Sequence, residues 1–128
     1  MPLDINIKRQ VDDKGYSVVT VELGGSLDTA TAPQLETELS ATLNDQVKDL
    51  IFDLANLTFI SSAGLRVFAA TRKYLKQREE QVSFVNLQPQ IREVFEIVKA
   101  LPGVSVFGSI GEFDNYLVAR QQKILEGE

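Results

Sequence analysis

The sequence contains no cysteine and no histidine among its 128 residues. Without cysteine it can form no disulfide, thiolate metal site or cysteine nucleophile. Without histidine it lacks the commonest metal ligand and the commonest general base near neutral pH. Most familiar catalytic centres are therefore excluded.

Long apolar runs are absent too. The richest one, residues 50–56, is soon broken by polar residues, whereas a membrane helix needs about 18 or more consecutive apolar residues. The N-terminus alternates like a strand and lacks the basic segment and apolar core of a signal peptide. We expect a cytoplasmic protein without membrane insertion.

Positive charge is scarce. The 13 Lys and Arg residues are outnumbered by 18 Asp and Glu residues, and the net charge of -5 would repel a phosphate backbone. Nucleic acid is therefore not an expected partner. The rest of the composition, 44% hydrophobic and 24% charged, is that of an ordinary globular chain, and the length suits a single domain over residues 1–128.

Five segments have the alternating or β-branched, apolar composition of strands. They are residues 1–9, 16–23, 49–54, 81–85 and 104–107. Residues 12–15 predict a turn that joins the first two strands into a hairpin, and residues 55–58 predict another after the third strand. Gly24 and Gly25 predict a bend after the second.

Four segments have helical periodicity. The first is expected from Ala32 to Leu43, with Thr31 and Gln34 at the spacing of a capping box. The second begins near Ser62. Its broad apolar face is expected to be buried and consists of Leu65, Val67, Phe68, Ala69, Ala70, Tyr74 and Leu75.

The last two helices have clear boundary signals. The third starts at Pro89 and stops before Pro102. The fourth is capped by Ser109 with Glu112, and fraying is expected from Gln121 to the end.

The resulting element order is ββαβαβαβα. Short connections, with helices between successive strands, favour parallel pairing and right-handed crossovers, while the opening hairpin adds an antiparallel pair. The sequence therefore predicts an α/β fold with a mixed sheet of about five strands and roughly four helices.

The most informative segment is residues 57–66, where two serines lie between a buried strand and an amphipathic helix. Ser61 or Ser62 could accept hydrogen bonds from the first helical turn, and the small Ala63 and Gly64 leave those N–H groups open to an anion. An equally weighted interpretation is that the serine only caps the helix, which contributes about 1 kcal/mol. Gly64 could likewise serve close packing alone.

Catalysis by these serines is not expected. There is no histidine, no Ser-x-x-Lys arrangement and no Gly-x-Ser-x-Gly elbow, and the chain has no phosphate-binding glycine motif. Asp28 and Asp53 are weak evidence for a metal site because no third oxygen-rich motif accompanies them. Asp28 is read more simply as a turn residue, and Asp53 as a hydrogen-bond partner of a neighbouring loop. We expect neither a metal nor a cofactor.

Three ordered segments resemble the STAS-domain anti-sigma factor antagonists of bacteria. Residues 24–28 resemble the family's Gly-x-Leu-Asp segment, residues 49–54 its central strand, and residues 59–65 its Asp-Ser-x-Gly-Leu loop. The ordered set is far more specific than any single piece.

The resemblance implies a phosphorylation switch. The matching target serine is Ser62, phosphorylated by a partner that is both an anti-sigma factor and a serine kinase of the GHKL type. The unmodified protein would bind this partner and free its sigma factor, and a serine phosphatase would reverse the modification. The implied partner-binding residues are Asp28, Ser61, Ser62, Ala63, Gly64 and Arg66. We expect a monomer when the protein is free.

One position departs from the family pattern. Ser61 stands where the family has an aspartate, which should make a phosphate on Ser62 easier to accommodate and makes Ser61 a second choice for the modified residue. A phosphate at a helix N-terminus also suits the macrodipole. The expected switch is therefore local, acting through charge and bulk at the interface without a large change of fold.

Two other interpretations remain. The chain could be a constitutive STAS scaffold subunit of a sensory or lipid-transport complex, with Ser62 only a helix cap. It could also be a small enzyme or ligand-binding domain that uses Asp28, Asp53 and the serines as a polar pocket.

Overall fold

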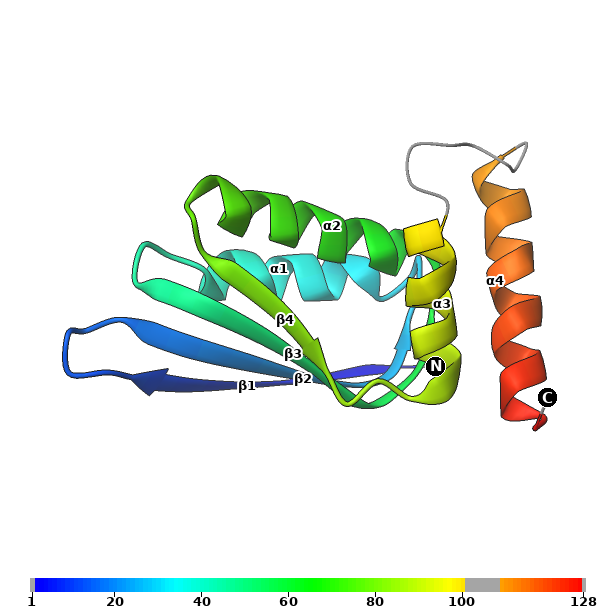
Figure 1. Ribbon diagram of the computed structural model, residues 1–128, viewed down its shortest axis with the longest axis horizontal. Coiled ribbons are helices and arrows are strands. Elements are labelled where there is room, and N and C mark those ends of the chain that lie inside the picture. Colours follow the sequence, from blue (N-terminus) through cyan, green and yellow to red (C-terminus); the bar gives the residue numbers. More distant parts are fainter. Residues whose placement is uncertain (1, 101–108, 128) are drawn as a thin grey trace.

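The computed structural model describes residues 2–100 and 109–127. Two helices cover one face of a sheet, and two more stand at one end of it (Figure 1). The elements in chain order are β1 Leu3–Val11, β2 Ser17–Leu27, α1 Ala32–Thr42, β3 Val47–Ile60, α2 Ser62–Gln77, β4 Gln81–Val85, α3 Pro89–Ala100 and α4 Ile110–Leu125.

The sheet is mixed, as expected, with the order β1-β2-β3-β4. β1 and β2 pair antiparallel, while β2 with β3 and β3 with β4 pair parallel. The predicted hairpin turn is confirmed, because Gly15 N–H donates to the Asp12 carbonyl at 3.1 Å and the Asp12 carboxylate accepts two further N–H groups. The expected strand over residues 104–107 lies outside the described residues.

The prediction of a turn at residues 55–58 was wrong, because β3 continues through them to Ile60. The register with β2 shifts at three places, and two of them lie near this segment, between Glu22 and Gly24 and between Gly25 and Ser26. β3 carries an extra residue at each of these two places. These bulges let turn-like residues remain in a strand.

The expected bend at the paired glycines is also wrong, since Gly24 and Gly25 lie within β2. Gly25 has φ +90, and a Cβ there would collide with the Pro2 carbonyl oxygen. Glycine is required at this point by both its backbone conformation and the close approach of Pro2, which directly precedes β1.

The core lies between the sheet and the helices. Phe52, Phe68 and Phe84 form an aromatic cluster with ring centroids 4.8–5.3 Å apart.

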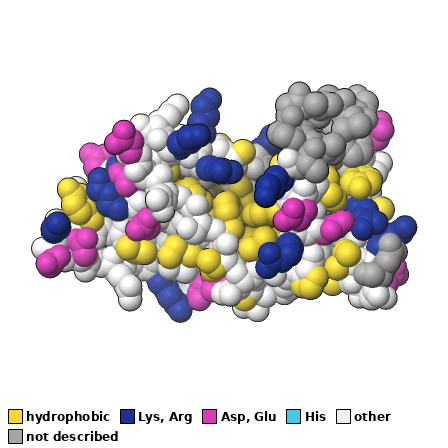
Figure 2. All heavy atoms as spheres, viewed as in Figure 1, with side chains coloured by type: hydrophobic (Ala, Val, Ile, Leu, Met, Phe, Trp, Pro, Cys, Tyr) yellow, Lys and Arg dark blue, Asp and Glu magenta, His cyan; other side chains and the backbone are white. Residues whose placement is uncertain are grey.

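Hydrophobic side chains also show on the surface over α2 and β4, next to α3, flanked by Lys and Arg (Figure 2).

The predicted buried face of α2 was too broad. Ala69 and Ala70 are exposed and Tyr74 is 42% exposed, whereas Thr71 is buried and donates its hydroxyl to the Val67 carbonyl at 2.8 Å. Part of the apolar stripe of α2 therefore faces out of the core.

The capping box expected at α1 is also wrong. The Thr31 hydroxyl donates to the Ser26 carbonyl at 2.8 Å, and the Gln34 amide donates to the Leu3 carbonyl at 3.1 Å. Both side chains bind strand carbonyls in place of the helix end, which fastens α1 to β1 and β2.

α4 begins as predicted, with Ser109 Oγ accepting from Glu112 N–H at 3.1 Å. The expected fraying from Gln121 is wrong, because α4 continues to Leu125 and Gln121 is 1% exposed. Within the described ranges, no helix combines the length and the hydropathy needed to cross a bilayer.

Candidate functional site

The loops that follow β2 and β3 meet at one edge of the sheet. Leu27 and Ile60 are partners in the parallel register, and Ser61 N–H donates to the Leu27 carbonyl at 2.9 Å. This bond brings the Asp28 loop next to the serine pair, because parallel strands end at the same edge.

Ser62 is the first residue of α2, and both of its donors bind one carboxylate. Its N–H donates to Asp114 Oδ1 at 2.8 Å, and its hydroxyl donates to Asp114 Oδ2 at 2.9 Å. Asp114 belongs to α4 and lies 52 residues further along the chain. A carboxylate from another helix therefore occupies the N-terminus of α2, where the macrodipole favours negative charge. Ser62 is 4% exposed.

Ser61 is the N-cap residue of α2 but makes no side-chain cap hydrogen bond. Its Oγ is buried and has no hydrogen-bond partner among the described residues. The prediction of a serine hydroxyl cap was therefore wrong, since Asp114 performs that role. Ser61 replaces the aspartate of the family pattern, but Asp114 still places a carboxylate next to Ser62.

Gln121 of α4 holds the residue just before the serines. Its Nε2 donates to the Ile60 carbonyl at 2.9 Å and to the Leu117 carbonyl at 3.1 Å, while its Oε1 accepts from Ile60 N–H at 3.0 Å. Neither Asp114 nor Gln121 was predicted from the sequence, because both act across a long chain separation and no local pattern marks them.

Gly64 faces the core. A Cβ at this position would lie 2.6 Å from Leu27 Cγ and 2.9 Å from Ile60 Cγ1. The space that its missing side chain leaves is thus filled by two apolar side chains. Its closeness to them supports the packing interpretation of this glycine.

Asp28 and Asp53 both bind neighbouring backbone. Asp28 Oδ1 accepts from the N–H groups of Ala30 and Thr31 at 3.0 Å each, so it orders the turn into α1. Asp53 Oδ1 accepts from Ala55 N–H at 3.1 Å and from the Asn86 side chain at 3.2 Å, as expected for a bond to a neighbouring loop. The described part of the chain contains no cluster of three or more acidic side chains able to hold a metal ion.

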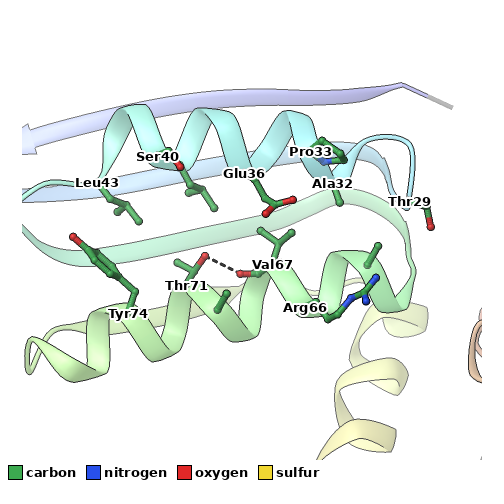
Figure 3. Close-up of a pocket in the computed structure, with 13 residues that line it drawn as sticks. Thr29, Ala32, Pro33, Glu36, Ser40, Leu43, Arg66, Val67, Thr71 and Tyr74 are labelled. Carbon is green, nitrogen blue, oxygen red and sulfur yellow. Dashed lines mark hydrogen bonds between the residues drawn. The ribbon is translucent and has the colours of Figure 1, made fainter. Parts of the chain in front are cut away.

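A groove of about 750 Å³ runs between α1 and α2. Side chains from both helices point into it, with Glu36 on one wall and Arg66 on the other (Figure 3). Its remaining lining residues are Thr29, Ala32, Pro33, Leu39, Ser40, Leu43, Ala63, Val67, Ala70, Thr71 and Tyr74.

The groove contains two of the predicted partner-binding residues, Ala63 and Arg66. The other four predicted residues do not line the groove but are next to lining residues in the chain. Asp28 directly precedes Thr29, and Ala63 has Ser61 and Ser62 before it and Gly64 after it. Neither aspartate of the polar-pocket interpretation lines the groove, and neither serine does. The groove therefore begins at the N-terminus of α2, directly after Ser62.

Comparison with known proteins identifies the family. The STAS domain model matches residues 7–113. The anti-sigma-B factor antagonist of Staphylococcus aureus is 33% identical over 95 residues, covering 74% of this chain and 85% of the relative. The crystal structure of an anti-sigma factor antagonist from Mycobacterium paratuberculosis has a TM-score of 0.62 at 26% identity and covers 92% of this chain and 95% of that one.

The same fold occurs in SpoIIAA. Its unphosphorylated form has a TM-score of 0.59 at 17% identity, covering 98% of this chain and 100% of that one. The phosphorylated form from Bacillus has a TM-score of 0.53 at 22% identity, covering 70% and 82%. With the domain match and the Staphylococcus relative, these findings show that the chain belongs to the family of STAS-domain anti-sigma factor antagonists.

Proposed function

We propose that the protein is a phosphorylation-switched antagonist of an anti-sigma factor. In the unmodified state it binds an anti-sigma factor that is also a serine kinase of the GHKL type, and the sigma factor is freed. Phosphorylation of Ser62 ends this complex, and a serine phosphatase restores the binding form. The role is binding and not catalysis.

One observation carries the proposal. Ser62 is the first residue of α2 and directly precedes Ala63, which lines the groove between α1 and α2. A modification of Ser62 therefore changes the rim of the surface on which we place the partner. The family membership supplies the class of partner, and SpoIIAA, which shares the fold, has been solved both unphosphorylated and phosphorylated.

The chemistry of the switch is a single phosphoryl transfer. The Ser62 oxygen bonds to the γ-phosphorus of ATP, the bond to the β-phosphate oxygen breaks, and ADP and the hydroxyl proton leave. The product carries about -1.5 to -2 extra charges. Closing an interface over an incompletely paired phosphate costs a few kcal/mol, and each 1.4 kcal/mol or so weakens binding tenfold.

The test uses the GHKL-type serine kinases of the source organism, each purified separately. Binding is measured by calorimetry to the unmodified protein and to protein carrying genetically incorporated phosphoserine at position 62. We expect one kinase to bind the unmodified form, to transfer phosphate from ATP to Ser62, and to bind the phosphorylated form at least about tenfold more weakly. Equal affinity for both forms would contradict the switch. Ser83→Ala, at an exposed serine of β4 outside the groove, is the matched control and should leave both binding and modification intact.

A second candidate function has its own support. The Ser62 hydroxyl is nearly buried and already bound to Asp114, as a purely structural helix start would be. This favours a constitutive STAS scaffold, in which Ser62 is never modified. Partner capture from cells that is unaffected by Ser62→Ala, with no phosphate on Ser62, would select this alternative.

A further inference from the structure

α4 holds the loop between β3 and α2 at two points. Asp114 binds the N–H and the hydroxyl of Ser62 at 2.8 and 2.9 Å, and Gln121 binds the N–H and the carbonyl of Ile60 at 3.0 and 2.9 Å. Asp114 and Gln121 lie two helical turns apart, with the fully buried Leu117 between them. One face of α4 thus holds the residues on both sides of Ser61, namely Ile60 and the proposed phosphorylation site Ser62.

A phosphoryl group on Ser62 is incompatible with this clamp. The modified oxygen has no proton to donate, so the hydrogen bond to Asp114 Oδ2 is lost. The phosphate also places two like-charged groups within a distance that now holds a 2.9 Å hydrogen bond. Because Ser62 is nearly buried, the phosphate cannot turn into solvent while Asp114 stays in place.

The phosphate also competes for what Asp114 binds. The N-terminus of a helix is an anion site, and a phosphate on its first residue can accept from the same N–H groups and interact with the same macrodipole. Asp114 is therefore both repelled and replaced as the cap of α2.

The rest of α4 keeps a separate attachment. Arg120 Nη2 lies 3.1 Å from Glu93 Oε1 of α3, and α3 and α4 lie side by side at the end of the sheet (Figure 1). Loss of the Asp114 contact would therefore free the N-terminal part of α4 from Ser62, while the Arg120–Glu93 ion pair still ties the helix to α3.

We propose that α4 is a clamp that phosphorylation of Ser62 releases. In the unmodified protein, Asp114 and Gln121 close the β3–α2 loop against α4. In the phosphorylated protein, the phosphate takes over the helix cap, Asp114 leaves, and the N-terminal half of α4 opens. A partner then meets a displaced helix as well as a new charge, so the switch extends beyond the local charge and bulk expected from the sequence. This inference rests on the proposed function for the occurrence of the phosphate in cells.

The clamp also bears on how the phosphate is added. A kinase can reach the Ser62 hydroxyl only after Asp114 has moved, because the side chain is 4% exposed in the closed arrangement. Opening of α4 is thus required for the modification and is then maintained by it.

The test is hydrogen exchange of full-length protein carrying genetically incorporated phosphoserine at position 62, read by mass spectrometry. We expect amides in residues 110–117, the N-terminal half of α4, to exchange at least about tenfold faster than in the unmodified protein, a loss of about 1.4 kcal/mol in local protection. The strand core at residues 47–54 should not change. Unchanged exchange over α4 would overturn the proposal.

The role of Asp114 is tested by comparing the wild type with Asp114→Asn, each with and without phosphoserine at position 62. Asparagine keeps an acceptor for Ser62 N–H but carries no charge, so phosphorylation should change α4 exchange much less in this background, whether α4 starts closed or already open. Suppose that α4 is protected in the unmodified Asp114→Asn protein and that phosphorylation speeds its exchange by the same factor as in the wild type. That result would overturn the role of Asp114. Glu126→Gln, which removes one charge from the far end of α4, is the control and should behave like the wild type.

These experiments need no cognate kinase. If Ser62 is never modified in cells but the phosphoserine protein opens, the proposed function fails and the clamp remains. If the partner distinguishes the two forms but α4 exchange is the same in both, the clamp fails and the proposed function remains.

Discussion

The two adjacent serines, Ser61 and Ser62, differ in the hydrogen bonding of their side chains. Ser62 has both of its donors bound to Asp114, whereas the buried Ser61 Oγ has no hydrogen-bond partner among the described residues. A buried hydroxyl without a partner is destabilising by about 1–3 kcal/mol relative to a satisfied one. The two residues therefore differ in what their removal does to stability.

Ser61→Ala is expected to leave the free energy of unfolding unchanged or to raise it by up to about 1 kcal/mol, because no cap bond is lost. Ser62→Ala loses a hydroxyl bond to a carboxylate and should lower the same quantity by about 1–2 kcal/mol. Urea denaturation of both variants measures the difference. A loss of about 1 kcal/mol or more in Ser61→Ala would show that its hydroxyl does cap the helix.

Gly64→Ala should destabilise the fold although alanine is the better helix former. The new Cβ would lie 2.6 Å from Leu27 Cγ, so the helix or the loop must shift, at about 1–3 kcal/mol. Thermal denaturation checks this. Ala69→Gly, on the exposed side of α2, measures the difference in helix propensity alone and should lower the stability by about 1 kcal/mol. A stabilised Gly64→Ala protein would contradict the close packing.

Helix α4 packs beside α3, with Leu117 buried and Arg120 in an ion pair with Glu93. Two more of its side chains, Asp114 and Gln121, also order the site. Gln121 is buried and satisfies both backbone groups of Ile60. Its position near the end of the chain led to the expectation of fraying, since the local sequence contains no signal for a contact with β3. The contact exists only because the fold brings α4 to the end of the sheet.

Gln121→Leu is expected to lower the free energy of unfolding by about 2 kcal/mol, because Ile60 N–H and C=O lose their partners in a buried position. Gln122→Leu makes the same change at the neighbouring exposed residue and should have little effect. Chemical denaturation compares the two variants. Equal effects would mean that Gln121 does not hold the loop.

The groove between α1 and α2 was only partly visible in the sequence. Apolar residues such as Ala70 and Tyr74 share the helical period of the core, so they were assigned to it, but the structure places them in the groove lining. Periodicity marks an apolar face and does not say whether the sheet or a partner covers it.

Arg66→Ala should weaken binding of the proposed anti-sigma factor kinase by about tenfold, since Arg66 is an exposed cation on the groove wall beside the proposed switch. Arg72→Ala removes the same charge from an exposed position of α2 outside the groove. Calorimetric titration with the identified kinase compares them. Equal affinities for the two variants would move the interface away from the groove.

The whole molecule shows what local patterns can and cannot supply. The mixed α/β architecture, the hairpin and the helix that starts at Ser62 were predicted, because each depends on periodicity and turn residues within a short window. The family resemblance was confirmed over residues 7–113. The long bulged β3 was missed, because its register depends on its neighbour β2.

The candidate site was predicted in its chain position and not in its surroundings. Ser61 and Ser62 lie at the start of α2 as expected, but the carboxylate that binds Ser62 comes from Asp114, 52 residues further along the chain. A contact of this separation depends on the finished fold and has no signature in the local sequence.

The most direct test is site-resolved mass spectrometry of the protein recovered from its own cells across growth and stress conditions, with Ser62→Ala expressed in the same way. A phosphorylation switch predicts phosphate on Ser62 in part of the population, and its disappearance in the variant without transfer to Ser61. Ser62 that is unmodified under every condition, in cells where Ser62→Ala behaves like the wild type, would contradict the switch.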